Sequence, residues 1–276
     1  MPAPNAISAD KLVRLIGTPA CPLLVDLGGD PAVPFIPGVV RRDPAGVRAW
    51  SHALPPRPVV VIDADGGAAA HAVAAWLRSD GREAEVLEGG AAGWRAAGHP
   101  LVATGRLPAR GAEGGTLWVT RARPKVDRIA CPWLIRRFVD PEARFLFVPA
   151  AEVLPVAGRT GAEPFDIDGE GVVWSHRGDL CTFDVMVEDF GLPAIAPLTQ
   201  LAAIVRGADT DRLDLVPEAA GLLAVSLGLS RMYADDLAQL DAGMLVYDAL
   251  YRWCRDARGE THNWASHAPA AAKVRA

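Results

Sequence analysis

The chain has 276 residues, enough for two domains of ordinary size that each bury a core. Half of the residues are hydrophobic and 22% are charged, which is the balance of a globular protein and excludes a disordered or membrane-embedded class. The net charge of -5 argues against indiscriminate nucleic-acid binding, because such binding needs an excess of Lys and Arg.

The sequence indicates neither secretion nor a membrane segment. Its first residues lack a charged region followed by an apolar core, and no uninterrupted apolar window of about 18 residues occurs. Cys21, Cys131, Cys181 and Cys254 are widely spaced without a C-x-x-C pair, which speaks against a disulfide scaffold or a zinc knuckle. We therefore expect a cytoplasmic protein that does not associate with membranes.

Strands and helices alternate over residues 1–105, so we expect an α/β domain with a mainly parallel sheet. Pro58–Ile62 is a β-branched run of the kind that is buried on both faces of such a sheet. The other expected strands are 23–27 and 84–87, and the expected helices are 9–16, 68–79 and a short one around Trp94.

This front part resembles a single rhodanese domain, most clearly in the segment LEGGAAGWRAAGHP at residues 87–100. In that family a loop after the strand corresponding to 59–62 presents a cysteine at a helix N-terminus, where backbone N–H groups stabilise a thiolate or persulfide. Here the loop holds Asp63, Ala64 and Asp65. We therefore expect no sulfurtransferase activity and interpret the domain as a scaffold or partner-binding module.

Residues 102–115 are rich in Gly, Ala, Arg and Pro and show no hydrophobic periodicity. We therefore predict a front domain over 1–105, a linker over 106–115, a second domain over 116–264, and a flexible Ala-rich tail over 265–276.

The second domain begins with a segment, Arg123–Asp140, that carries five basic side chains and two acids among apolar positions. Pro132 favours a helix that starts near Cys131 and runs through Phe138; a start near Lys125 would place a kink at the proline. Cations near a helix N-terminus make an anion site, and arginine offers the two-pronged donor that tetrahedral oxyanions fit. The alternative is solvated surface charge with local ion pairs.

Residues 144–148, 164–168 and 172–175 read as strands, and the last of them leads into His176 and Arg177. The following helix, which starts near Cys181, places Asp184 and Glu188 within reach of His176. Helices expected over 198–205, 217–227 and 233–254 make this domain α+β and mostly helical. The histidine is interpreted either as a structural residue or as a ligand.

Four motifs in this order resemble the C-terminal domain of ChrB-type chromate-resistance proteins. They are RPKVDRIACPWLIRRFVD at Arg123–Asp140, SHRGDLCTFD at Ser175–Asp184, IVRGADT at Ile204–Thr210 and MLVYDALYRW at Met244–Trp253. The resemblance spans roughly residues 116–264. It implies participation in chromate resistance, as a stress-response protein that binds an oxyanion such as chromate, or a metal, as a sensor or regulator.

The alternative that the resemblance leaves open is a metal- or thiol-dependent enzyme acting on an oxyanion or redox species. The candidate oxyanion-binding residues are Lys125, Arg128, Arg136 and Arg177. The candidate catalytic residues are Lys125, Asp127, Arg128, Cys131 and His176.

The candidate metal ligands are His176, Asp184, Asp209 and His262, with Fe, Mn or Zn as the metal. The sequence departs here from the family pattern, which has histidine at the position of Arg206 in many relatives and glutamate at that of Asp184. Arginine cannot ligate a metal, so His262 is the replacement nitrogen ligand.

We further predict that Lys125, Arg128, His176 and Arg177 line one pocket, which requires His176 to lie within about 12 Å of Arg128. DNA binding is not favoured, since no DNA-reading motif occurs and the charge balance is acidic. A protein partner is expected for the front domain.

Overall fold

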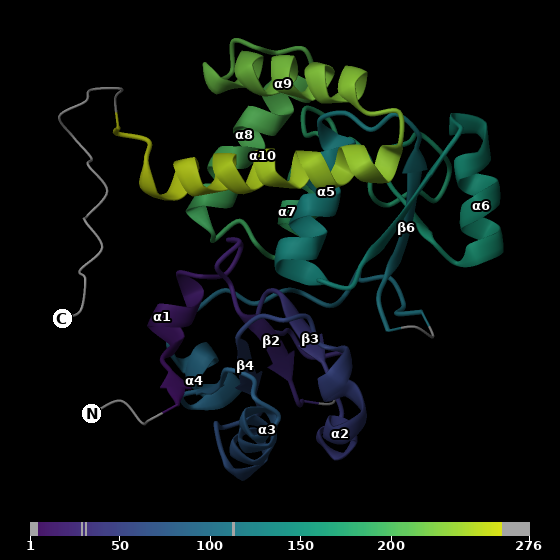
Figure 1. Cartoon of the computed structure of the whole chain (residues 1–276). Coiled ribbons are helices and arrows are strands. Elements are labelled where there is room, and N and C mark those ends of the chain that lie inside the picture. Colours follow the sequence, from purple (N-terminus) through teal and green to yellow (C-terminus); the bar gives the residue numbers. More distant parts are fainter. Residues whose placement is uncertain (1–4, 29, 31, 112–113, 261–276) are drawn as a thin grey trace.

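The computed structural model of the chain describes residues 5–28, 30, 32–111 and 114–260. Its two parts are stacked in Figure 1, with the front domain below and the rear domain above. Both expected fold classes are confirmed, an α/β front domain and a mostly helical α+β rear domain. His262 and the predicted tail lie outside the described residues. No helix in the described part of the chain is long and apolar enough to cross a bilayer.

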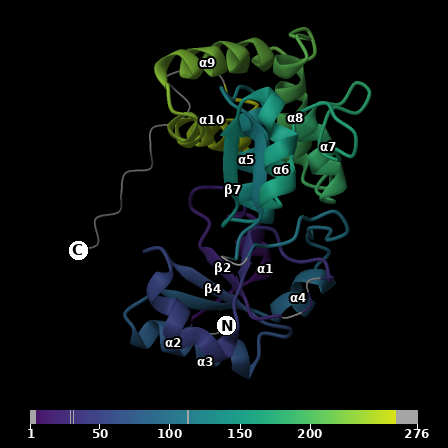
Figure 2. The same ribbon diagram turned by 90° about the vertical axis from the view of Figure 1, so that its right-hand side faces the viewer.

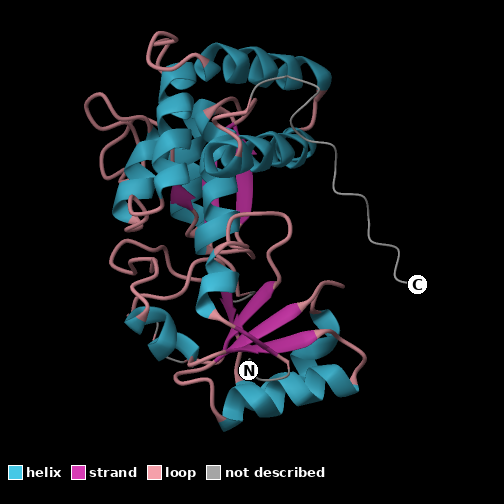
Figure 3. Ribbon diagram, turned by 90° about the vertical axis from the view of Figure 1, so that its left-hand side faces the viewer, coloured by secondary structure: helices cyan, strands magenta, loops and turns pink. Residues whose placement is uncertain are grey.

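The front domain is built on a parallel five-stranded sheet in the order β1-β5-β4-β2-β3, seen as the fan of arrows in the lower half of Figure 3. The strands are β1 (Ala6–Ile7), β2 (Leu23–Asp26), β3 (Val39–Arg41), β4 (Val59–Ile62) and β5 (Ala84–Leu87). The helices are α1 (Ala9–Val13), α2 (Val47–Trp50), α3 (Ala68–Ser79) and α4 (Gly90–Ala96).

Alternate residues of the central strands enter two different cores. Val59 and Val61 pack with α3 on one face, while Val60 and Ile62 face α1 and α4. The second of these cores continues without interruption into the rear domain and reaches Trp133. The two domains therefore share apolar packing rather than being joined by the linker alone.

The described residues of the rear domain combine a small parallel sheet, in the order β7-β6-β8, with the α-helices α5 to α10 (Figure 2). The strands are β6 (Leu117–Arg121), β7 (Arg144–Val148) and β8 (Glu163–Pro164). The helices are α5 (Asp127–Leu134), α6 (Val153–Thr160), α7 (Thr182–Asp189), α8 (Ala196–Asp209), α9 (Glu218–Met232) and α10 (Asp236–Asp256). Trp133 and Phe138 are fully buried among these helices, as the apolar pattern indicated.

Several predicted boundaries in the rear domain are wrong, each for a local reason. The strands expected over 164–168 and 172–175 reduce to β8 and a single bridge from Phe165 to Trp174, because Asp166 takes a positive φ of 52°. The helix expected over 198–205 runs through Gly207, which packs closely on Ala219. Gly228 likewise lies inside α9 instead of ending it.

The basic segment follows the second of the two predicted helix registers, the start near Lys125 rather than near Cys131. Helix α5 begins at Asp127 and holds Pro132 inside it, and the chain then passes into a π-helical turn over Ile135–Val139. Short π turns interrupt α-helices mostly near functional residues. The early start matters here because it places Asp127 at the N-terminus of α5.

Candidate metal centre

The N-terminus of α5 is held by a strained residue, Val126, with φ 24° and ψ −94°. A β-branched side chain rarely adopts positive φ, so surrounding contacts must enforce it. Its amide donates to Ser226 Oγ at 3.0 Å, and its carbonyl accepts from Tyr247 Oη at 2.8 Å. Helices α9 and α10 thus hold the backbone just before Asp127 and so fix the direction of the Asp127 side chain.

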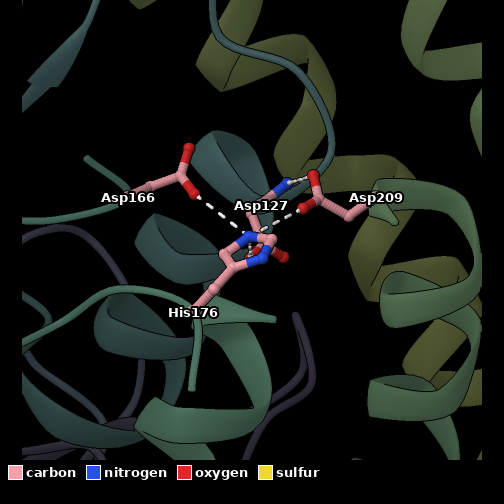
Figure 4. A group of neighbouring side chains, drawn as sticks. All are labelled: Asp127, Asp166, His176 and Asp209. Atoms are coloured by element: carbon pink, nitrogen blue, oxygen red, sulfur yellow. Dashed lines mark hydrogen bonds and ion pairs between the residues drawn. The ribbon is translucent and has the colours of Figure 1, made fainter. Parts of the chain in front are cut away.

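Four side chains from separate segments meet at this point: Asp127, Asp166, His176 and Asp209. One ligand atom from each lies within 4.8 Å of the other three. His176 Nε2 lies 3.1 Å from Asp209 Oδ2, 3.7 Å from Asp166 Oδ1 and 3.8 Å from Asp127 Oδ2. Figure 4 shows the imidazole between the carboxylates, which approach it from different sides.

Each carboxylate is positioned by its backbone setting. Asp127 opens α5, Asp209 ends α8, and Asp166 follows β8 in a left-handed conformation. Asp127 Oδ2 accepts from the Phe183 amide at 3.2 Å, and Asp166 Oδ1 accepts from Thr182 Oγ1 at 3.0 Å. The start of α7 therefore orients two of the three acids.

The remaining oxygen of Asp127, Oδ1, is buried and has no hydrogen-bond partner in the described structure. Asp127 itself is 0% exposed. Burial raises its pKa well above the usual 3.8, and the charges of Asp209 and Asp166 raise it further. Burial and the charge of Asp166 also raise the pKa of Asp209. A buried carboxylate beside two others is costly unless a cation compensates it.

Two arginines, Arg121 and Arg128, contact Asp166 Oδ2. Arg121 Nη2 donates to Asp166 Oδ2 at 3.2 Å, and Arg128 Nε lies at the same distance from that oxygen. The Arg128 contact is an ion pair without an aligned hydrogen bond, since Nε has no hydrogen-bond partner. His176 is 42% exposed in its side chain, so the cluster is open to solvent on the imidazole side.

Comparison with known proteins identifies the family of the rear domain. A sequence model described as the C-terminal domain of ChrB matches residues 118–254. The rear domain is a ChrB C-terminal domain. Protein ChrB of Cupriavidus metallidurans is 36% identical over 156 residues, which cover 56% of this chain and 46% of that protein. The match thus spans about half the length of the curated relative.

Solved structures similar to the front part include a rhodanese-related protein from Thermoplasma volcanium. It is 22% identical, with a TM-score of 0.33, over 36% of this chain and 98% of that one. A rhodanese homologue from Thermus thermophilus is 25% identical, with a TM-score of 0.27, over 32% and 96% of the two chains. Likeness at this level carries no inference about activity.

In the ChrB domain, Arg128 and His176 contact the same carboxylate, that of Asp166, which puts them inside the 12 Å limit set above. The other residues of the predicted oxyanion pocket do not converge there. Arg177 forms a two-pronged ion pair with Asp189 at the end of α7. Arg136 contacts Asp241 and stacks on the ring of Phe145. Lys125 is exposed, immediately before Val126.

The predicted metal ligands of the ChrB domain separate into two groups. His176 and Asp209 lie in the cluster. Asp184 does not, because its Oδ2 caps α7 by accepting from the Cys181 amide at 3.1 Å and its Oδ1 pairs with Arg206 at 2.8 Å. Arg206 thus neutralises Asp184.

Two of the three thiols in the ChrB domain, those of Cys131 and Cys181, are poorly suited to redox chemistry. Cys131 and Cys181 are fully buried, and burial followed by the charge of Asp127 raises the pKa of each. Both therefore stay protonated at neutral pH. The structure does not support the predicted catalytic role of Cys131.

Sequence reasoning missed Asp166. It lies in PFDID, which read as a continuous strand, and neither its positive φ nor its partners have a sequence signal of their own. The alternation of acids at Asp166 and Asp168 just before two glycines was the available hint of a turn.

Proposed function

We propose that the ChrB domain binds one divalent transition-metal ion through Asp127, Asp166, His176 and Asp209, and uses this centre to bind an oxyanion such as chromate. In this proposal the chain is a chromate-resistance-associated, cytoplasmic sensor or regulator. The observation that carries it is the fully buried Asp127, whose Oδ1 has no partner within the described structure and whose carboxylate clusters with His176 and two further acids.

Ion pairing alone is the simpler explanation, and it leaves this oxygen unexplained. A protonated His176 would pair with Asp209, and the arginines would neutralise Asp166. Neither contact reaches Asp127 Oδ1. A metal ion among the four ligand atoms would offset the repulsion between the three acids and compensate the buried charge of Asp127.

The ligand set favours Mn²⁺ or Fe²⁺ over Zn²⁺. Three carboxylates supply the oxygen ligands that Mn²⁺ prefers, and one imidazole suits the later transition metals. Structural zinc sites usually carry more cysteine or histidine ligands than this. Four protein ligands also leave positions open on a six-coordinate ion, which an oxyanion oxygen can fill.

Arg121 supports the oxyanion part of the proposal. Its side chain is 43% exposed, and its guanidinium already reaches the metal-facing carboxylate of Asp166. An anion bound on the solvent side of the ion would lie within reach of this guanidinium, which offers a two-pronged donor. The buried thiols argue against the thiol-dependent alternative.

The front domain fits an inactive partner-binding module in this proposal. Asp63 stands in the loop where the rhodanese family places its cysteine, and its own carboxylate accepts the loop amides of Gly66 and Gly67. That contact occupies the donors that a persulfide or anion would need.

Calorimetric titration of the chelator-treated protein with Mn²⁺ tests the proposal. We expect one site per chain, at least about 100-fold weaker in His176→Ala and Asp209→Asn. Asp168→Asn is the matched control, because Asp168 is an exposed acid two residues from Asp166 and outside the cluster. Equal affinity in all four proteins would refute the metal centre. Chromate or sulfate binding that requires Mn²⁺ would support the oxyanion step.

A further inference from the structure

The junction between the two domains contains a cavity of about 110 Å³ that shares no residue with the metal cluster. The front domain contributes Gly17, Cys21 and Arg57 to its wall, and the rear domain contributes Arg136 and Arg137. Its volume is enough for several water molecules but smaller than the roughly 300 Å³ typical of pockets for larger organic ligands.

Three arginine residues line this cavity, and no acid is among the described residues that line it. Arg57 donates through Nη2 to the Cys21 carbonyl. Arg137 donates through Nε and Nη2 to Asp248, at 2.8 Å each, which leaves Nη1 available. Arg136 meets its acid, Asp241, at a marginal 3.5 Å on the exposed side.

The charges at the cavity are therefore only partly compensated. Asp248 neutralises Arg137 from inside the rear domain, Asp241 is 76% exposed and weakly placed on Arg136, and Arg57 has a carbonyl partner rather than an acid. Arg57 of the front domain and Arg136 of the rear domain thus line the same small, partly enclosed space, and Arg136 also donates to the Ala143 carbonyl and lies over the Phe145 ring. Such a space is electrostatically suited to a small divalent anion.

The π turn explains how Arg136 and Arg137, neighbours in sequence, both reach this wall. Residues 135–139 are wound more widely than in an α-helix. Next to them the backbones of the two domains touch: the Gly38 amide donates to the Phe138 carbonyl at 2.7 Å. A Cβ at Gly38 would lie 3.0 Å from the Arg137 carbonyl, so a glycine is needed for this approach.

We propose that this junction binds a small tetrahedral oxyanion of the sulfate class, held by Arg57 from the front domain and by Arg136 and Arg137 from the rear domain. The bound anion connects the domains and tightens their contact. This site is independent of the proposed metal centre. Cys21 lines the cavity without acting as a nucleophile, since burial raises the pKa of its thiol to about 11.

Calorimetry with sodium sulfate, at ionic strength held constant with sodium chloride, tests this site. We expect sulfate to bind the full chain and each of Arg57→Gln and Arg136→Gln to weaken it about tenfold, with little heat left in the double variant. Arg137 is left intact because its pairing with Asp248 supports the fold. Arg159→Gln is the control, since Arg159 is an exposed arginine of α6 outside the cavity.

Two further measurements separate the possible sources of a signal. The Asp209→Asn variant should bind sulfate as the wild type does, and loss of binding in it would assign the anion to the metal cluster instead. Amide hydrogen exchange in a peptide that contains Gly38 should slow when sulfate is added. Unchanged exchange, or sulfate heat that persists in the double variant, would overturn the proposal.

Discussion

Asp63 in the front domain and Asp127 in the rear domain are both buried acids near the start of a helix, but they differ in their hydrogen-bond partners and in the charges around them. Asp63 Oδ1 accepts from the amides of Gly66 at 2.6 Å and Gly67 at 3.2 Å, and Oδ2 accepts from Ala70 at 3.0 Å. Asp127 accepts one amide on Oδ2, while Oδ1 accepts none and two further acids stand beside it.

The difference separates a structural carboxylate from a candidate ligand. Backbone N–H groups at the start of α3 donate to both carboxylate oxygens of Asp63. Asp63 therefore stabilises its loop, and these N–H groups are not available to an external anion. Asp127 has one such donor, the Phe183 amide, and is repelled by Asp166 and Asp209, so we propose a cation as its missing partner. Substitutions of Asp127 and of Asp63 should therefore have different effects on metal binding and on stability.

The largest effect is expected for Asp127→Asn. The amide keeps an oxygen for the Phe183 amide but removes the buried charge, so Mn²⁺ affinity should fall at least about 100-fold. The same change should stabilise the metal-free protein by about 1 kcal/mol, or raise Tm by about 2–4 °C, at neutral pH. Thermal unfolding with and without Mn²⁺ measures both. A metal-free variant less stable than the wild type would contradict the assigned repulsion.

The pH dependence of stability should have the sign set by these raised pKa values. With Asp127 and Asp209 titrating above 3.8 in the folded state, the folded protein holds more protons than the unfolded one above that pH. The two acids therefore lower the unfolding free energy of the metal-free protein as pH rises from about 3.8 through their folded values. Mn²⁺ displaces those protons, so its stabilisation should grow over the same window. Denaturant titrations across pH, with Asp127→Asn as control, check this.

A smaller loss is expected for Asp63→Ala. Removing a carboxylate that serves three backbone amides should destabilise the front domain by about 1–2 kcal/mol. Mn²⁺ affinity in the rear domain should not change. Chemical unfolding followed by Mn²⁺ titration tests both expectations, and a loss of metal affinity would show that the two acids are not independent.

No measurable thiosulfate:cyanide sulfurtransferase activity is expected from the wild type. The Asp63→Cys variant should also stay below a normal rate, because Asp65 remains in the loop to repel the anionic substrate. An enzymatic assay against the reagent blank decides this. Wild-type turnover that disappears in Cys21→Ser would overturn it.

The smallest effect is expected in a DNA-binding assay. Arg121 and Arg128 contact Asp166, Arg137 pairs with Asp248, and Arg123 donates to the Tyr233 carbonyl, so few cations of the basic segment are free for phosphates. Any binding should be weak at physiological salt and fall steeply as salt rises. A gel shift that is sequence-specific and salt-resistant would contradict this expectation.

The regular parts of this fold were predictable because their patterns are local. The β-branched run of β4 and the Ala-rich α3 lie where the sequence indicated. Helix ends in the rear domain were not, since Gly207 remains helical where it packs on Ala219, and Gly228 remains helical although it is exposed. At the site, the sequence indicated His176, Asp127 and Asp209 as candidates. It could not indicate Asp166, because the position of this residue depends on a left-handed backbone conformation. It could not exclude Asp184 either, because that residue lies outside the cluster through its ion pair with Arg206.

Anomalous diffraction from Mn²⁺-soaked crystals tests the central claim most directly. We expect one peak between the four side chains, about 2.0–2.3 Å from a carboxylate oxygen of Asp127 and from ligand atoms of Asp166, His176 and Asp209. An empty cluster, with Asp127 Oδ1 bonded instead to a protein donor or to an ordered water, would contradict it.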